Sequence, residues 1–252
     1  MRLKDAVDAG KVIVTERERH GEDRAQVNAL FIENISSDTV FILSGEIVTG
    51  GKQDRMVRTD VVLAPHSDKV DLSVYCVEAG RWEGESNLFM MVENSLAPNE
   101  VRQSAIKGAD QKEVWDKVEV QLEAKEVLSE SSRMLDVRSA VSEDAIRDYV
   151  EKLSGVFRNK SNIVGVVAVS GNDAIGCDLF ATHELFEQHF PNLLQSYAWQ
   201  ANTGDVRSAD PERVGNYWRR VMITVKKDGG FLRTKDQIVR KKDPAHFSMV
   251  VE

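Results

Sequence analysis

The chain has 252 residues, enough for one large domain or two small ones with a substantial hydrophobic core. Apolar residues make up 42% of it and charged residues 29%, proportions typical of a globular protein, which exclude wholesale disorder. A formal net charge of −8 argues against a general affinity for nucleic acid or for acidic membranes.

The N-terminus, the apolar runs and the cysteines predict a cytoplasmic protein. Met1–Lys11 carries scattered charges and lacks the apolar stretch of a signal peptide. The longest apolar runs, such as Ile163–Val169, are far too short to cross a bilayer, so no membrane association is expected. Two cysteines, Cys76 and Cys177, do not form a disulfide framework, which fits a reducing compartment. A basic cluster at Arg233–Lys242 is typical of a solvated strand edge.

The first hundred residues predict β-strands. They are rich in Val, Ile and Phe and are punctuated by Gly, Asn and Pro, as strands and their turns are. Asn34–Asp38 predicts a turn between two paired strands. The expected strands are Lys11–Thr15, Gln26–Glu33, Thr39–Val48, Met56–Ala64 and Lys69–Glu78.

Helices are expected from Pro98 to about Asp136. Proline suits a first helical turn, and Gly108 divides the stretch into two helices. Apolar residues follow the helical period at Val114, Trp115, Val118 and Leu122. A further helix is expected from Ser142, a favourable N-cap, with a buried face made by Ile146, Tyr149, Val150, Leu153 and Phe157.

The last hundred residues alternate between strands and helices. Thr182 is expected to cap a helix whose buried face holds Phe186, Phe190, Leu193, Leu194 and Tyr197. Asp210–Pro211 predicts another helix start. The expected strands are Asn162–Ser170, Ala174–Phe180, Val221–Val225 and Phe247–Val251, with turns at Ser170–Asp173 and Asp228–Gly230.

This order of elements predicts an α+β fold, with a strand-rich N-terminal part, a helical middle and a mixed α/β C-terminal part. Residues 1–97 would form the β-rich part and residues 98–252 the helical and α/β part. One continuous domain is the alternative, because the helical middle is able to pack on both ends.

The first polar segment of interest follows an alternating strand. Val70, Leu72, Val74 and Cys76 share one face, and Glu78 joins that buried face if the register continues. A buried carboxylate needs a partner, and Arg81 lies within reach across Gly80. Trp82 would supply an apolar wall or a stacking plane. The alternative is a structural Glu78–Arg81 pair that holds the turn.

The second polar segment is Ser44–Arg55, in which an apolar strand leads into paired glycines and four polar residues. Gly50 and Gly51 let the backbone turn or approach a ligand closely. The residues that follow are donors and acceptors for an anionic group, namely Lys52, Gln53, Asp54 and Arg55. The alternative is a β-turn with a solvated tip. The segment is not a phosphate-binding P-loop, because Gln53 stands where a hydroxyl is required and no helix follows.

Nucleophilic and metal chemistry have weak support. Cys76 lies on the apolar face, where a thiol is inert packing. His183 and His189 are six residues apart on a predicted helix, face different sides and are expected to be partly exposed. Glu46, Asp54 and Glu78 would bind a hard cation only if they met in space, and no metal site is predicted.

The chain resembles the ARG and rhodanese-phosphatase-superfamily-associated protein domain family, where ARG stands for ADP-ribosylglycohydrolase. The resemblance covers roughly Lys11 to Ala201 and is carried by Ser44–Glu46, Gly50–Arg55 and Tyr75–Trp82, with weaker support from Trp115 and Asn192–Ala198. It implies a genomic association with enzymes of ADP-ribose and NAD metabolism and specifies no activity or cofactor.

Two hypotheses of different classes follow. In the first, Lys52, Arg55 and Arg81 contact a small anionic ligand related to ADP-ribose, Gln53 orients it and Trp82 stacks on it. If there is catalysis, Glu46 or Glu78 acts as a general base or as a metal ligand. In the second, the same residues form a structural core of a non-enzymatic scaffold. Open placement of the two glutamates favours a ligand, and enclosed pairing with arginine favours a scaffold.

Overall fold

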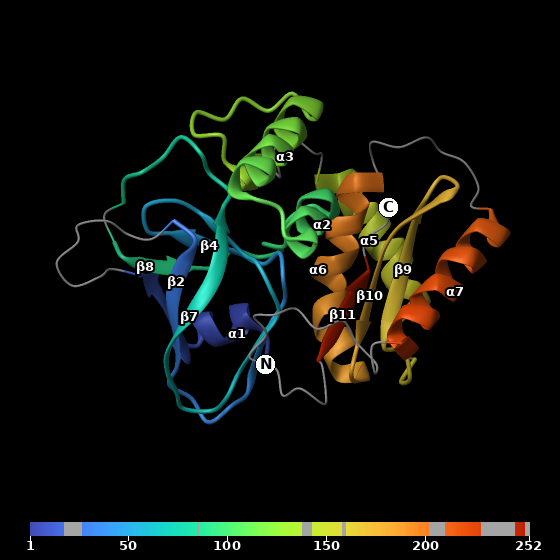
Figure 1. The fold of residues 1–252 in the computed structure, drawn as a ribbon, viewed down its shortest axis with the longest axis horizontal. Helices are drawn as coiled ribbons and strands as arrows, with labels where there is room; N and C mark the ends of the chain where they lie inside the picture. The colour runs from blue at the N-terminus through green and yellow to red at the C-terminus, as the bar shows by residue number, and fades with distance from the viewer. Residues whose placement is uncertain are drawn as a thin grey trace. The chain divides into compact units, whose positions relative to one another are not determined.

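The computed structural model describes residues 1–17, 27–84, 86–137, 143–157, 160–201, 210–227 and 245–249. It divides into two compact units, Met1–Ser142 and Glu143–Glu252. The predicted α+β class is confirmed, since a strand-rich part precedes helices and then a smaller mixed part (Figure 1).

The first unit is built on a closed barrel of antiparallel strands in the order β1-β2-β7-β5-β4-β8. The ring closes because β8 pairs with both β1 and β4. A short helix, α1 (Leu3–Asp8), and a two-stranded sheet of β3 (Val40–Ile42) and β6 (Val61–Leu63) accompany it. The barrel strands are β1 (Val12–Glu16), β2 (Ala29–Asn34), β4 (Ile47–Gly50), β5 (Arg55–Val57), β7 (Ser67–Cys76) and β8 (Leu88–Met90).

Two of the predicted strands are each divided in the structure. The predicted strand Thr39–Val48 becomes β3 and β4, because Gly45 turns the backbone with a φ of +94°. Only glycine adopts this conformation readily, and a Cβ at this position would collide with the Arg102 side chain. The predicted strand Met56–Ala64 likewise becomes β5 and β6.

The helical middle packs with the barrel. Gly108 ends α2 (Asn99–Lys107) in a left-handed conformation, and the Asp110 carboxylate caps α3 (Gln111–Ala124) by accepting the Glu113 amide at 2.9 Å. The short helix η1 (Met134–Asp136) follows. Barrel residues Ile47, Met56, Tyr75 and Val77 share a core cluster with Val101, Ala105, Val114, Val118 and Leu122. The expected boundary between residues 97 and 98 therefore lies inside the first unit.

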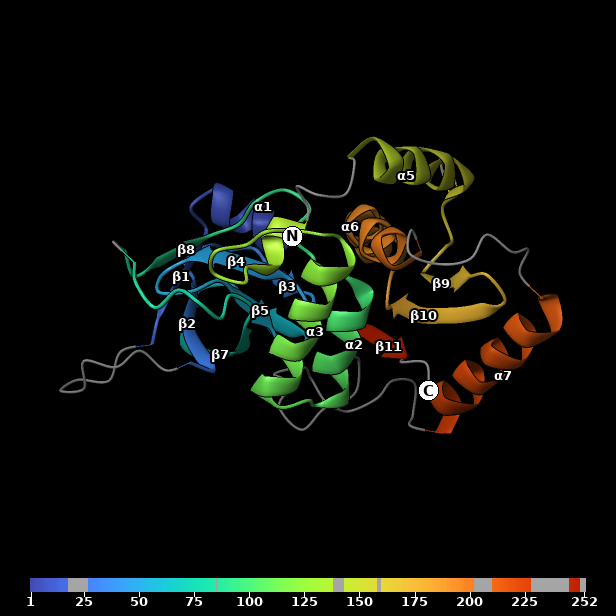
Figure 2. The ribbon, with the colours of Figure 1, turned by 90° about the horizontal axis from the view of Figure 1, so that it is seen from above.

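The second unit is a three-stranded antiparallel sheet in the order β11-β10-β9 with helices (Figure 2). Asp178 on β10 contacts Tyr197 of α6, whereas its neighbour Cys177 packs with Tyr217 and Val221 of α7. Successive strand residues face opposite ways, so α6 and α7 cover opposite faces of the sheet. The elements are α5 (Glu143–Phe157), β9 (Gly165–Ser170), β10 (Asp173–Phe180), α6 (His183–Ala201), α7 (Pro211–Lys227) and β11 (His246–Met249).

Several predictions for this unit change. The predicted strand Val221–Val225 is wrong, since these residues continue α7. His189 is fully buried rather than partly exposed, and its ring stacks on Phe180 at 5.7 Å. The predicted turn Asp228–Gly230 and the basic cluster Arg233–Lys242 lie outside the described residues. Within the ranges given above, no helix has the length and apolar character needed to cross a membrane.

Candidate functional site

The two polar segments lie side by side at one end of the barrel. Strand β5 pairs with β7, which places Arg55 opposite Cys76. Beyond the strands, Arg81 donates from Nη1 to the Gly51 carbonyl oxygen at 2.8 Å. The expected proximity of Gly50–Arg55 and Glu78–Trp82 is therefore observed directly in hydrogen bonds.

Glu78 is enclosed and fully engaged. Arg81 donates two hydrogen bonds to the Glu78 carboxylate, from Nε to Oε1 at 3.0 Å and from Nη2 to Oε2 at 2.7 Å. The Ser131 hydroxyl donates to Oε1 at 2.7 Å, and the Asp54 amide donates to Oε2 at 3.0 Å. Burial alone would raise the pKa of Glu78, but these donors together hold it below the ordinary value. Glu78 is thus an ionised anchor with no lone pair directed at a ligand.

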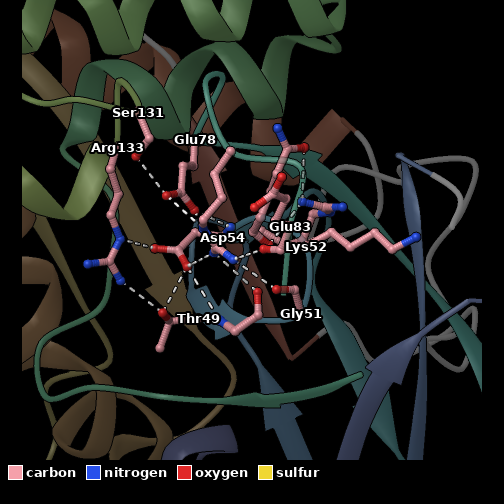
Figure 3. A network of polar contacts seen from close by, with 12 residues as sticks. Thr49, Gly51, Lys52, Asp54, Glu78, Glu83, Ser131 and Arg133 are labelled. Carbon is pink, nitrogen blue, oxygen red and sulfur yellow. Dashed lines mark hydrogen bonds and ion pairs between the residues drawn. The ribbon is translucent and has the colours of Figure 1, made fainter. Parts of the chain in front are cut away.

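Asp54 anchors a second arginine. Its Oδ2 accepts from Arg133 Nε at 2.7 Å, and its Oδ1 accepts from the Thr49 hydroxyl at 2.8 Å. Arg133 Nη2 also donates to Thr49 Oγ1 at 2.9 Å, and Arg81 Nη2 lies 3.5 Å from Asp54 Oδ1 (Figure 3). We call the set Thr49, Asp54, Glu78, Arg81, Ser131 and Arg133 the Glu78 network. Sequence reasoning missed Thr49, Ser131 and Arg133.

The glycines allow the loops to close on one another. Gly51 has a φ of +48°, and a Cβ there would collide with Phe89 and Glu16. Gly84 packs so tightly on the Gly51 carbonyl that any side chain would push the two loops apart. The Lys52 amide donates to Glu16 Oε1 at 2.8 Å, which ties the same loop to strand β1.

Arg55 is fully buried and incompletely partnered. Its Nη1 donates to the Gln53 carbonyl at 3.0 Å and to Gln53 Oε1 at 3.3 Å. Its Nη2 lies 3.9 Å from Glu16 Oε1, an ion pair without a hydrogen bond. Among the residues that the structure describes, Arg55 Nε, Arg55 Nη2 and Glu16 Oε2 have no hydrogen-bond partner. Buried polar groups rarely lack a hydrogen-bond partner, so the Arg55–Glu16 pair has unsatisfied hydrogen-bonding capacity beside the Gly50–Arg55 loop. Glu16 was also missed from the sequence.

Trp82 stands beside these cations. Its side chain is exposed, with 44% of the residue accessible. Its ring centre lies 5.7 Å from Lys52 Nζ and 5.8 Å from Arg55 Cζ, within cation–π range. The Lys52 side chain extends away from the Glu78 network (Figure 3). Lys52, Arg55 and Trp82 therefore form a small group of two cations and one ring, distinct from Arg81 and Arg133, which are hydrogen-bonded to carboxylates.

Glu46 lies apart from this group. It forms an isolated bridge with Leu96 and accepts the Leu43 amide at 3.0 Å through Oε2. Burial raises the pKa of its carboxyl to about 8. Among the described residues, Arg81 forms ion pairs with Glu78 and Asp54 rather than with Glu46. No hydrogen bond or ion pair within the described ranges links Glu46 to the Glu78 network.

Cys76 is buried, as predicted. Its Sγ lies 3.3 Å from the Val27 carbonyl oxygen, and burial raises the pKa of the thiol to about 11. The thiol is therefore neutral near pH 7, which disfavours nucleophilic chemistry. Over the same parts of the chain, no three His, Cys, Asp or Glu side chains are grouped as metal ligands.

The chain matches a known protein-family model. No curated protein and no solved structure matches the chain. A family model described as ARG and Rhodanese-Phosphatase-superfamily-associated Protein domain, ARPP-1, matches residues 1–230. That range contains the whole first unit, with the Gly50–Arg55 and Glu78–Trp82 segments that suggested the resemblance. The chain belongs to the ARPP-1 family.

Proposed function

We propose that the first unit is a binding module for a small phosphate-bearing ligand of the ADP-ribose and NAD class. Lys52 and Arg55 contact the anionic group, and Trp82 stacks on a base or ring. Arg81 contributes through its hold on the Gly50–Gly51 carbonyls rather than by touching the ligand. The family name, which refers to ADP-ribosylglycohydrolase and rhodanese-phosphatase proteins, fits this class of ligand.

The observation that carries the proposal is the pair of unpartnered nitrogens on Arg55, counted over the described part of the chain. A buried guanidinium with two free donors is costly, and a phosphate oxygen would satisfy both. Because Arg55 is enclosed and its guanidinium lies over the Trp82 ring, the ligand reaches it when that ring moves aside. Trp82 is 44% exposed, so neighbouring side chains do not enclose its ring.

The module binds without catalysing a reaction. Glu78 is held on both oxygens by Arg81, Ser131 and a backbone amide, so it has no free oxygen to take a proton. Glu46 is buried at a different place, where its carboxyl contacts the Leu43 amide. Enclosed placement of both glutamates argues for a structural role for each.

Calorimetric titration with ADP-ribose tests the proposal. Lys52→Ala and Trp82→Ala should each weaken binding by about tenfold or more, since each removes one direct contact. Matched controls are Lys112→Ala and Trp218→Ala, which remove an exposed lysine and a tryptophan that is 41% exposed. Equal binding by all four variants would overturn the assignment, as would an absence of binding by the unmodified protein.

A second candidate function is a non-enzymatic scaffold. The enclosed pairing of Glu78 with Arg81, and of Asp54 with Arg133, favours it. If the first unit is a scaffold, ADP-ribose, NAD and inorganic phosphate should give no heat of binding. The stability of the folded chain should then depend on Arg81. The titration above therefore separates the two candidates.

A further inference from the structure

The apolar face of α5 is only partly covered. Tyr149 and Leu153 were expected to be buried, yet they are 42% and 43% exposed. Both line a cavity of about 240 Å³ within the second unit, where α6, β9 and β10 form the other walls. Figure 2 shows α5 beside α6, with β9 and β10 next to them. The cavity lies where packing of this helix on the sheet is incomplete.

The walls of this cavity are chemically uniform. Every residue that lines it is aliphatic or aromatic, and none carries a charge. Strand β9 contributes Val166 to Val169, four consecutive residues that all remain partly exposed. The Tyr197 hydroxyl on the α6 wall already donates to Asp178. A charged ligand would lose its hydration in this cavity without gaining an oppositely charged or hydrogen-bonding partner, so charged ligands are excluded.

The volume sets the size of the occupant. A dry apolar cavity of about 150 Å³ takes a benzene ring, so this one takes about ten non-hydrogen atoms. The aromatic rings of Phe157 and Phe190 meet edge to face at 4.5 Å in the wall, an arrangement that a further planar ring extends. We propose that this cavity binds a neutral, apolar, ring-bearing small molecule.

The proposal also explains why the cavity is not collapsed. Empty apolar space forfeits dispersion contacts, so a core of this composition is expected to close on itself. Here Tyr149 and Leu153 of α5 stay exposed beside the cavity instead. A ring inserted between Leu153 of α5 and Leu194 of α6 would contact both and cover the exposed Leu153 side chain. This site is independent of the ligand proposed for the first unit.

Naphthalene, with ten carbon atoms, is the test probe, and 1-naphthoate is its charged counterpart. Naphthalene fluorescence titrated with the full chain should saturate, and 1-naphthoate should bind at least about tenfold more weakly because its carboxylate must be desolvated. Ala168→Leu and Ala198→Leu fill the cavity from two walls and should weaken naphthalene binding by about tenfold or more. Ala124→Leu, at an exposed position on α3 of the other unit, is the matched control and should leave binding unchanged.

Saturable binding of naphthalene that survives both filling substitutions would overturn the proposal, as would equal binding of the two probes or no binding. If the filled variants do not fold, NMR contacts between naphthalene and the methyl groups of Leu153 and Leu194 in the unmodified protein decide the matter. Contacts to those methyls support the site, and contacts only to other residues reject it.

Discussion

Arg81 holds a buried carboxylate while its own side chain remains 31% exposed. Arg81→Ala leaves Glu78 with the Ser131 hydroxyl and the Asp54 amide as its remaining donors. Loss of a two-bond charged pair at a partly exposed position should lower the free energy of unfolding by about 2–3 kcal/mol. Denaturant-induced unfolding, with the slope compared between the two proteins, measures it.

The matched control for this substitution is Arg213→Ala. Arg213 pairs with Asp173 on the surface, where both side chains are more than half exposed. Its removal should cost less than about 1 kcal/mol. A loss at Arg81 as small as the loss at Arg213 would contradict the anchoring role of the Glu78 network.

Glu46 gives the protein a pH-dependent stability of unusual sign. Burial raises the pKa of its carboxyl from 4.5 to about 8, so between these values the folded chain holds a proton that the unfolded chain releases. The contribution of Glu46 is therefore most favourable at low pH and is lost as the pH rises toward 8. The expected slope is on the order of 1 kcal/mol per pH unit.

Glu46→Gln should remove this slope, because the amide is neutral at every pH and its oxygen still accepts the Leu43 amide. The measurement is the unfolding free energy between about pH 5 and pH 8, where the glutamate contribution changes. Glu123→Gln changes an exposed residue on α3 and should leave the profile as it is. An unchanged profile in the Glu46 variant would show that the carboxylate is solvated in the folded protein.

At the scale of single residues, the sequence indicated the Gly50–Arg55 and Glu78–Trp82 loops but not the distant residues that bind them. Alternation along β7 correctly predicted a buried Cys76, and the short spacing of Glu78 and Arg81 predicted their pair. Arg133 lies 79 residues from Asp54, and no local pattern marks such a contact. In the sequence, Glu16 looks like an ordinary residue at the end of a strand. Its ion pair with Arg55 forms only in the closed barrel, so the sequence alone does not predict it.

Among the elements, α7 shows how a β-branched run is misread. Val221–Val225 has strand-like composition, but the run lies ten residues into a helix that starts at Pro211, and Tyr217 and Val221 share its buried side. In a strand, Val221 and Ile223 would face the same way. In the helix, Val221 is fully buried and Ile223 is 62% exposed.

Paired alanine substitutions test this assignment. Val221→Ala should lower the free energy of unfolding by about 2 kcal/mol, whereas Ile223→Ala should change it by less than about 0.5 kcal/mol. Denaturant unfolding of both variants gives the comparison. Similar losses at the two positions would support the strand that the composition suggested.

Elements with a clear period were predicted better than those broken by geometry. The residues Phe186, Phe190 and Leu193 form the buried face of α6 as expected. The break inside Thr39–Val48 was missed: Gly45 turns the backbone there with a positive φ, and the Arg102 side chain that packs against it comes from another element. Such contacts depend on the assembled fold and leave no periodic signal.

At the scale of the whole molecule, α2 and α3 complete the first unit. A fragment of residues 1–142 should therefore fold, and a fragment of residues 1–97 should not. The shorter fragment uncovers Ile47, Met56, Tyr75 and Val77 and removes Ser131 and Arg133 from the Glu78 network. Circular dichroism melting and binding of a hydrophobic dye compare the two. Equal cooperative melting would place the boundary near residue 97.

The closure of the barrel also sets an order of events during synthesis. β1 and β4 each have one edge that pairs with β8, so these two edges remain unpaired until Met90 has left the ribosome. The buried Asp54 carboxylate lacks its Arg133 partner for longer still, because Arg133 is translated 79 residues after Asp54. A pause in translation between Cys76 and Leu88 therefore prolongs the time during which the edges of β1 and β4 are exposed to aggregation.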